Sequence, residues 1–114
     1  MHELGIVFHI IDKLEEVGRE NSLASIQSVT VELGEVSAVI PEYLTDCWNW
    51  AVKKRELLKD ARMDVEILPA VTLCEDCGRK YGTVAGGRIC PHCGSERTHL
   101  LTGTEINIKQ IEAC

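Results

Sequence analysis

Two Cys-x-x-Cys pairs constrain this chain more strongly than any other feature of its sequence. They use four of the six cysteines, which are Cys74, Cys77, Cys90 and Cys93. Zinc prefers four soft ligands in a tetrahedron, and two intervening residues let both sulfur atoms of one tight turn reach the same ion. Gly78 and Gly94 directly follow the pairs. Glycine tolerates positive φ and lets backbone amides point back at the sulfur atoms. The pattern therefore predicts a four-thiolate zinc site.

Disulfide bonds are the alternative for these cysteines, but two such pairs with turn glycines favour a metal. Four thiolates leave zinc no open coordination position, which favours a structural role over a catalytic one. We expect residues 79–89, between the pairs, to form a short hairpin around Gly86 and Gly87.

The charge balance disfavours a polyanionic partner. The chain has 12 basic and 18 acidic residues, a net charge of −6. Between positions 74 and 99 there are four basic and three acidic residues, and zinc with four thiolates brings that segment to about −1. Zinc ribbons that bind nucleic acid carry a basic face. We therefore expect no nucleic-acid partner.

Length and cysteine usage indicate a cytoplasmic protein. No stretch is as long as a membrane span, and Glu3 and Asp12 interrupt the apolar run that a signal peptide needs. Thiolates used as ligands suit a reducing compartment, so we expect no membrane contact and no oxidised cysteines. A chain of 114 residues with 4% aromatics has room for one small aliphatic core, to which structural zinc adds about 10 kcal/mol.

The hydrophobic pattern predicts two helices and three strands. Apolar steps of three and four predict helices over 4–21 and from Pro41 to near Lys59. Alternation predicts strands over 25–34 and 63–67, with a last strand after Gly103 in which a β-bulge would explain the slipped alternation. The expected fold class is α+β: a small three-stranded sheet covered by two helices, with an inserted zinc-ribbon module.

The module is an insertion because the last strand follows the cysteines. We expect a domain of residues 1–71 plus 102–114 and a zinc-binding ribbon module of residues 72–101. The connections, 69–70 and 101–103, would also permit two chains to exchange modules, giving a domain-swapped homodimer.

The start of the chain offers a second metal-binding set. The α-amine of Met1, the amide nitrogen of His2 and the His2 imidazole form fused chelate rings, and the amide of Glu3 could add a fourth nitrogen. Such nitrogen sets suit square-planar Ni(II) or Cu(II). The alternative is a solvated histidine at a frayed end.

Several motifs together resemble the HypA/HybF family of nickel metallochaperones. The resemblance covers essentially the whole chain, and its most specific part is a terminal Met-His-Glu combined with a late four-cysteine ribbon. The matching motifs are Met1-His2-Glu3-Leu4, Glu32-Leu33-Gly34-Glu35-Val36-Ser37, Val39-Ile40-Pro41-Glu42, the two cysteine pairs and Gly103-Thr104-Glu105-Ile106.

This resemblance implies a metal carrier rather than an enzyme. It implies Ni(II) bound as transient cargo through His2, the Met1 amine and backbone nitrogens, with Glu3 adjacent. It also implies structural Zn(II) on the four paired cysteines. The implied partners are a HypB-type GTPase and the large subunit of [NiFe] hydrogenase, with urease as a further client in some organisms.

Two other functions remain open at this point: a nucleic-acid-binding zinc ribbon, and a zinc-stabilised protein adaptor that transports no metal. The remaining histidines and cysteines also have open roles. We expect His9 to be solvated and His92 to be an exposed residue within the second pair. His99 lies next to the hinge at 101–103 and would become a further ligand only if the zinc module folded toward the N-terminus. Cys47 lies on the apolar stripe of the second helix and is expected to be buried, whereas Cys114 is expected to be exposed.

Overall fold

The first helix forms because apolar residues recur along one of its faces. The structure is a computed structural model, and it describes residues 3–114. Helix α1 spans Glu3–Glu20, as the pattern predicted, with an acidic residue in its first turn and Arg19 in its last, both favourable to the helix dipole. Leu4 and Phe8, expected on the apolar stripe, flank it and are 39% and 37% exposed. The buried residues of α1 are Val7, Ile10, Ile11, Leu14 and Gly18.

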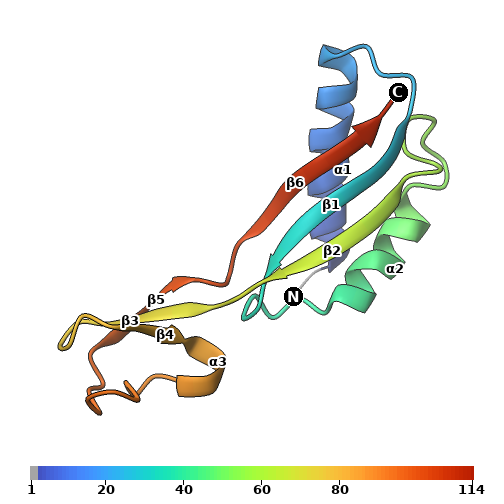
Figure 1. Ribbon diagram of the computed structural model, residues 1–114. Coiled ribbons are helices and arrows are strands. Elements are labelled where there is room, and N and C mark those ends of the chain that lie inside the picture. Colours follow the sequence, from blue (N-terminus) through green and yellow to red (C-terminus); the bar gives the residue numbers. More distant parts are fainter. Residues whose placement is uncertain (1–2) are drawn as a thin grey trace. The chain divides into compact units, whose positions relative to one another are not determined.

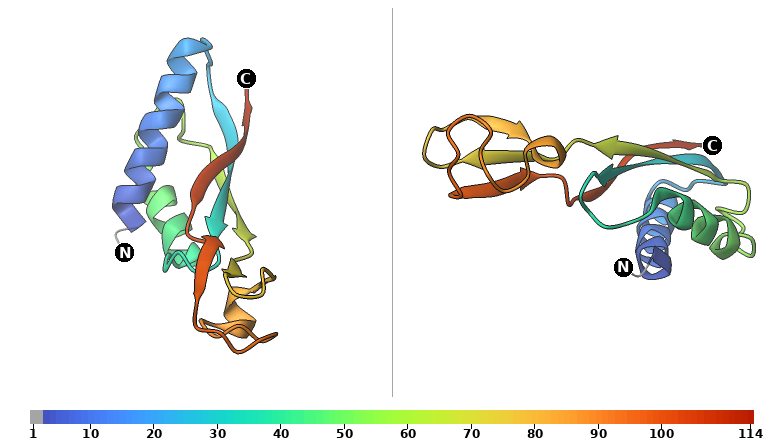
Figure 2. Two further views of the ribbon diagram at one scale, coloured as in Figure 1. Left: turned by 90° about the vertical axis from the view of Figure 1, so that its left-hand side faces the viewer. Right: turned by 90° about the horizontal axis from the view of Figure 1, so that it is seen from below.

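Three strands form the first sheet, in the order β2-β1-β6. They are β1 (Ile26–Gly34), β2 (Arg62–Leu68) and β6 (Ile106–Ala113). The central strand, β1, buries Val29, Val31 and Leu33 as its alternation predicted. The helices α1 and α2 (Pro41–Ala51) cover one face of this sheet and pack against each other (Figures 1 and 2). The predicted α+β class, a three-stranded sheet under two helices, is confirmed.

Helix α2 ends earlier than predicted. The pattern predicted a helix to near Lys59, but α2 stops at Ala51. Turns replace it, closed by the Arg55 amide on the Val52 carbonyl (3.0 Å) and the Leu58 amide on the Arg55 carbonyl (3.1 Å). The buried Trp48 indole donates to the Ala61 carbonyl at 2.9 Å. That bond fixes the returning chain against α2, and the turns let Val52 and Leu58 both be buried.

A second, smaller sheet carries the cysteines. It has the order β4-β3-β5, and its strands are β3 (Val71–Cys74), β4 (Lys80–Gly82) and β5 (Thr98–Thr102). Both neighbours of β3 are antiparallel to it, and Val71 pairs with Thr102. Strands β3 and β5 were absent from the sequence-based assignment because each has five residues or fewer, which is too short a run for alternation to identify a strand.

The predicted hairpin around Gly86 and Gly87 is wrong. Those glycines end a short helix, α3 (Thr83–Gly86). Gly87 has φ +67°, and its amide donates to the Thr83 carbonyl at 2.7 Å, which closes the turn. The hairpin of this region joins β3 to β4 through the first cysteine pair instead.

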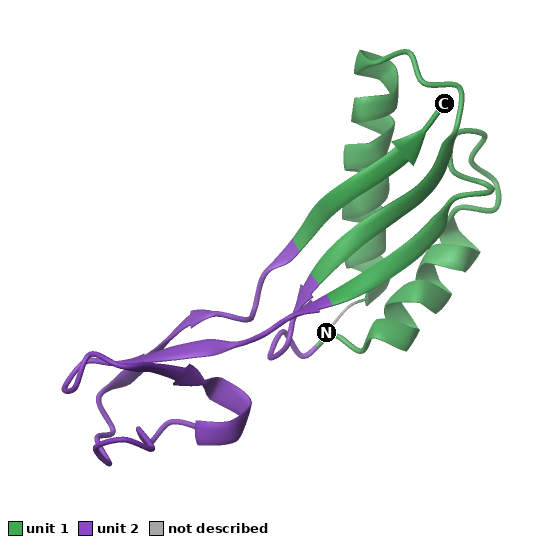
Figure 3. Ribbon diagram, in the orientation of Figure 1, with its two compact units in different colours: residues 1–32, 39–66, 107–114 green, residues 33–38, 67–106 purple. Residues whose placement is uncertain are grey.

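The chain divides into two compact units (Figure 3). Unit 1 comprises residues 1–32, 39–66 and 107–114, and unit 2 comprises residues 33–38 and 67–106. Unit 2 therefore contains the expected 72–101 module together with the segment 33–38 and the flanking residues 67–71 and 102–106. No helix in the described residues combines the length and apolar character needed to cross a membrane.

Hydrogen bonds hold the segment 33–38, which comprises the end of β1 and the loop after it, within unit 2. The Val36 amide donates to the Gly103 carbonyl at 2.9 Å, and the Ala70 amide donates to Glu35 Oε1 at 2.9 Å. A Cβ at Gly34 would lie 2.0 Å from the Gly103 carbonyl oxygen, so only glycine permits this approach. The connections at Ala70 and Gly103 are thus hydrogen-bonded segments.

Candidate metal centre

The four paired cysteines converge on one point. Their sulfur atoms all lie within 4.8 Å of one another. Cys74 Sγ is 3.6 Å from Cys93 Sγ, and Cys77 Sγ is 3.7 Å from Cys90 Sγ. A tetrahedral centre with zinc–sulfur bonds of about 2.3 Å needs sulfur separations of about 3.8 Å. Each of these two pairs combines one cysteine from each Cys-x-x-Cys turn. The donor set therefore fits a zinc ion.

The two Cys-x-x-Cys turns have the same backbone geometry. The Gly78 amide donates to the Cys74 carbonyl at 2.9 Å, and the Gly94 amide donates to the Cys90 carbonyl at 2.8 Å. Their φ angles are +74° and +76°. No heavy atom lies within 4 Å of a Cβ built at either glycine. Glycine is thus required by the backbone conformation and not by lack of space, as the sequence predicted.

The environment of Cys74 favours a thiolate. The backbone amide of Cys77 is the largest influence, and although burial opposes it, the pKa of Cys74 falls from 9.0 to about 7. The Ser95 amide lowers the pKa of Cys93, but the neighbouring thiol of Cys74 and burial raise it to about 12 overall. The Cys74 thiol therefore loses its proton readily, whereas the Cys93 thiol keeps its proton. A cation bound by the sulfur atoms would replace the remaining thiol protons and so stabilise neighbouring thiolates side by side.

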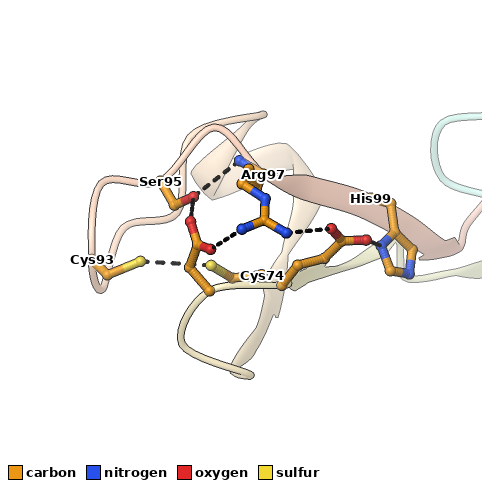
Figure 4. Close-up of polar contacts among 7 residues, drawn as sticks. Cys74, Cys93, Ser95, Arg97 and His99 are labelled. Carbon is orange, nitrogen blue, oxygen red and sulfur yellow. Dashed lines mark hydrogen bonds and ion pairs between the residues drawn. The ribbon is translucent and has the colours of Figure 1, made fainter.

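Charged side chains connect the two turns (Figure 4). Asp76, inside the first cysteine pair, accepts hydrogen bonds from the Ser95 hydroxyl and, at 2.8 Å, from Arg97 Nη1. Arg97 Nη2 also lies 3.8 Å from Glu75 Oε2, and His99 Nδ1 lies 3.1 Å from Glu75 Oε1. Both partners of Asp76 follow the second pair, so this network joins the turn at Cys74 to the turn at Cys93.

Sequence reasoning missed this network. The signal was present as two acidic residues between the first cysteines and a serine and an arginine shortly after the second pair. Spacing alone does not reveal such a contact, because the residues come together only when the two turns lie side by side in the fold.

The other candidate residues lie apart from the cluster or at its rim. His9 is exposed, Cys114 is exposed, and Cys47 is half-buried rather than buried. His92 is exposed, with Nδ1 3.4 Å from Arg79 Nη1, and its amide donates to Cys90 Sγ at 3.4 Å. His99 is about half exposed, and its imidazole contacts Glu75.

The predicted nickel ligands are not placed by the structure. Met1 and His2 lie outside the described residues, and Glu3 is the first residue of α1. The nickel assignment therefore stays a prediction.

Comparison with known proteins identifies the family. A family model described as "Hydrogenase/urease nickel incorporation, metallochaperone, hypA" matches residues 1–113. The chain belongs to the HypA family. Hydrogenase maturation factor HypA 1 of Bradyrhizobium diazoefficiens is 33% identical over 112 residues, which cover 98% of each chain. Hydrogenase maturation factor HypA of Aquifex aeolicus is 31% identical and covers 98% of this chain and 96% of its own.

Solved structures of HypA proteins have the same fold. The solution structure of the Ni metallochaperone HypA from Helicobacter pylori has a TM-score of 0.75 at 24% identity, covering 99% of this chain and 97% of that one. A second HypA solution structure has a TM-score of 0.77 at 25% identity, with 100% and 97% covered. The two-helix sheet and the inserted cysteine module are thus the HypA fold.

Proposed function

We propose that this protein is a nickel metallochaperone for the maturation of [NiFe] hydrogenase and that it is not an enzyme. The observation that carries the proposal is the match of the HypA family model over residues 1–113. The clustered thiols of the cysteine module, with sulfur separations close to those of a zinc tetrathiolate, support it.

In this proposal the four cysteines hold a structural Zn(II) ion. The ligands are Cys74, Cys77, Cys90 and Cys93, from two turns of matching geometry. Zinc bound by four thiolates has no open position for a substrate, so it would supply rigidity and no reaction chemistry. The zinc-binding module is residues 72–101, and residues 1–71 with 102–114 form the domain that carries nickel.

Nickel is the cargo, and it would bind at the first residues of the chain. The ligands are the His2 imidazole, the Met1 amine and backbone nitrogens, with Glu3 adjacent. A nitrogen set of this kind suits Ni(II) in square-planar geometry. Amide nitrogens must lose protons to coordinate, so nickel affinity falls as the pH is lowered.

The partners follow from what the chain lacks and from its family. The sequence contains no Gly-rich phosphate-binding loop, so a HypB-type GTPase would supply nucleotide hydrolysis. The large subunit of hydrogenase, and urease in some organisms, would receive the nickel. Thiolate ligands require a reducing compartment, which favours the cytoplasm. Exchange of the zinc module between two chains would give a homodimer, which size-exclusion chromatography would reveal.

The decisive experiment is a nickel titration of untagged protein that begins at Met1. We expect one Ni(II) per chain with a square-planar visible absorption band, and we expect His2→Ala to abolish both. His9→Ala is the matched control, since His9 is exposed on α1, and it should leave the titration unchanged. Equal binding by wild type and His2→Ala would refute the N-terminal site, and the protein would then be better described as a zinc-stabilised adaptor.

A further inference from the structure

The two tryptophans of α2 have opposite environments. Trp48 is fully buried, whereas Trp50, two residues later, is 65% exposed. The chain has only two Trp, two Tyr and one Phe. An exposed tryptophan such as Trp50 does not gain the free energy of burial that stabilises Trp48. Exposed aromatic side chains that cluster together are typical of interaction surfaces. Trp50 therefore needs an explanation outside the core of unit 1.

Trp50 lines a groove between the two helices of unit 1. The groove has a volume of about 420 Å³ and is bordered by Phe8 of α1 and by the last turn of α2 with the residues after it. Phe8 is 37% exposed. Two of the five aromatic side chains thus form the accessible floor of one depression, which suits an apolar side chain of a ligand.

Basic residues form the rim of the same groove. Lys53, Lys54 and Arg55 all line it, and they are the only run of three basic residues in the sequence. Arg55 is held toward α1 by Glu15, with Nη1 3.7 Å from Oε1. Within residues 3–114, neither lysine makes an ion pair. In a chain of net charge −6, the two lysines therefore give the groove a local positive charge that no ion pair neutralises within the described residues.

We propose that this aromatic-basic groove docks an acidic segment of a partner protein, with an apolar side chain of that segment on Phe8 and Trp50 and its carboxylates facing Lys53 and Lys54. Tryptophan and arginine are the residues most often found as energetic anchors of protein interfaces. Opposite charge around such an anchor steers the encounter and fixes its orientation. Three basic residues in an acidic chain are too few for a nucleic-acid surface, which needs an extended basic stripe.

The test uses a defined probe. A fluorescein-labelled peptide in which pairs of leucine alternate with aspartate–glutamate pairs is titrated with zinc-loaded protein, and anisotropy is measured. We expect saturable binding that weakens with added salt. We expect Trp50→Ser to weaken it by about tenfold or more, as for an interface anchor, and Lys53→Glu with Lys54→Glu to weaken it further. A peptide with lysine in place of the acidic residues should not bind.

Matched controls separate the groove from the rest of the surface. Tyr43→Ser removes another aromatic of α2, which is 56% exposed, and Lys13→Glu reverses a charge on α1; neither residue lines the groove. Both variants should bind as wild type does, and all variants should keep wild-type circular dichroism and zinc content.

Three results would overturn the proposal. The first is no binding of the acidic peptide up to about 1 mM, a range that covers weak docking contacts. The second is equal loss in the control variants. The third is a Trp50-dependent interaction with anionic phospholipid vesicles, with a single-stranded oligonucleotide, or with a second copy of this chain in place of the peptide.

Discussion

In unit 1 most of the side chains withdrawn from water are aliphatic, and they come from both helices, from β1 and β2 and from the turns after α2, around the fully buried Trp48. In unit 2 the corresponding cluster is Cys74, Tyr81 and Cys90. Two of those three residues, Cys74 and Cys90, are ligands of the proposed zinc site. The first unit thus has enough apolar surface to fold by burial, whereas the second has little. In the proposed function, zinc bound by the four cysteines takes the place of a hydrophobic core in unit 2.

The largest expected effect comes from removing the metal. Chelation of zinc, or Cys77→Ser, should unfold unit 2 and leave unit 1 folded, because metal-site formation contributes about 10–16 kcal/mol in isolated zinc modules at neutral pH. Amide resonances of residues 71–102 should lose dispersion while those of α1 and β1 stay in place. Cys114→Ser, which alters an exposed cysteine outside the cluster, is the control. Loss of dispersion in both units together would mean that they share one source of stability.

The reverse test removes the centre of the aliphatic core. Trp48→Ala deletes a fully buried side chain and its hydrogen bond to the Ala61 carbonyl, and should lower the free energy of unfolding of unit 1 by about 3–5 kcal/mol. Chemical denaturation followed by circular dichroism measures this. Zinc content should remain one ion per chain. A variant that loses its zinc as well would contradict the separation of the two units.

The cysteine turns allow a smaller and more local test. Gly78→Ala and Gly94→Ala should each lower the free energy of unfolding of unit 2 by about 1–2 kcal/mol, because both glycines have φ near +75° and alanine is strained there. Competition with a chromophoric chelator would show weaker zinc retention in both. Gly82→Ala is the matched control, since Gly82 has φ −68° and no atom within 4 Å of an added Cβ. If Gly82→Ala weakened zinc retention equally, positive φ would not be the reason for the glycines.

The smallest effect concerns Glu105. Its carboxylate accepts hydrogen bonds from the Thr102 hydroxyl and from the amides of Gly103 and Thr104, which lower its pKa from 4.5 to about 2. A carboxylate held below its unfolded pKa stabilises the fold above about pH 4.5, and that contribution is lost as the pH falls toward 2. Glu105→Gln should therefore be less stable than wild type at pH 7, with a difference that shrinks below pH 4.5.

Parallel denaturation series at several pH values would test this, with the exposed Glu112→Gln as control. A difference between wild type and Glu105→Gln that does not change with pH would mean that the side chain acts through its shape and not through its charge.

The same division explains what the sequence could predict. In unit 1 the apolar residues recur at the positions that are buried, so the bounds of α1 and β1 were predicted to within one residue. The end of α2 was not, because Val52 and Leu58 continue the apolar pattern through turns, and the hydrogen bond from Trp48 to Ala61 that fixes those turns leaves no mark in the sequence.

In unit 2 the cysteine spacing and the following glycines predicted the cluster and its positive φ angles. The strands around it were not predicted, because β3 and β5 are too short for alternation to identify them. The network of Asp76 with Ser95 and Arg97 depends on a meeting of two distant turns, which no local pattern records.

The pairing of Val71 with Thr102 has a consequence for how such a chain can vary. The first residue of β3 and the last residue of β5 are cross-strand neighbours, which in an antiparallel ladder places their Cα atoms about 5 Å apart. The segment 72–101 between them therefore begins and ends at neighbouring positions of the ladder. Because its two ends are adjacent, we expect that this segment can be lengthened, shortened or replaced by a tight reverse turn without displacing β2 and β6, the strands that precede and follow it.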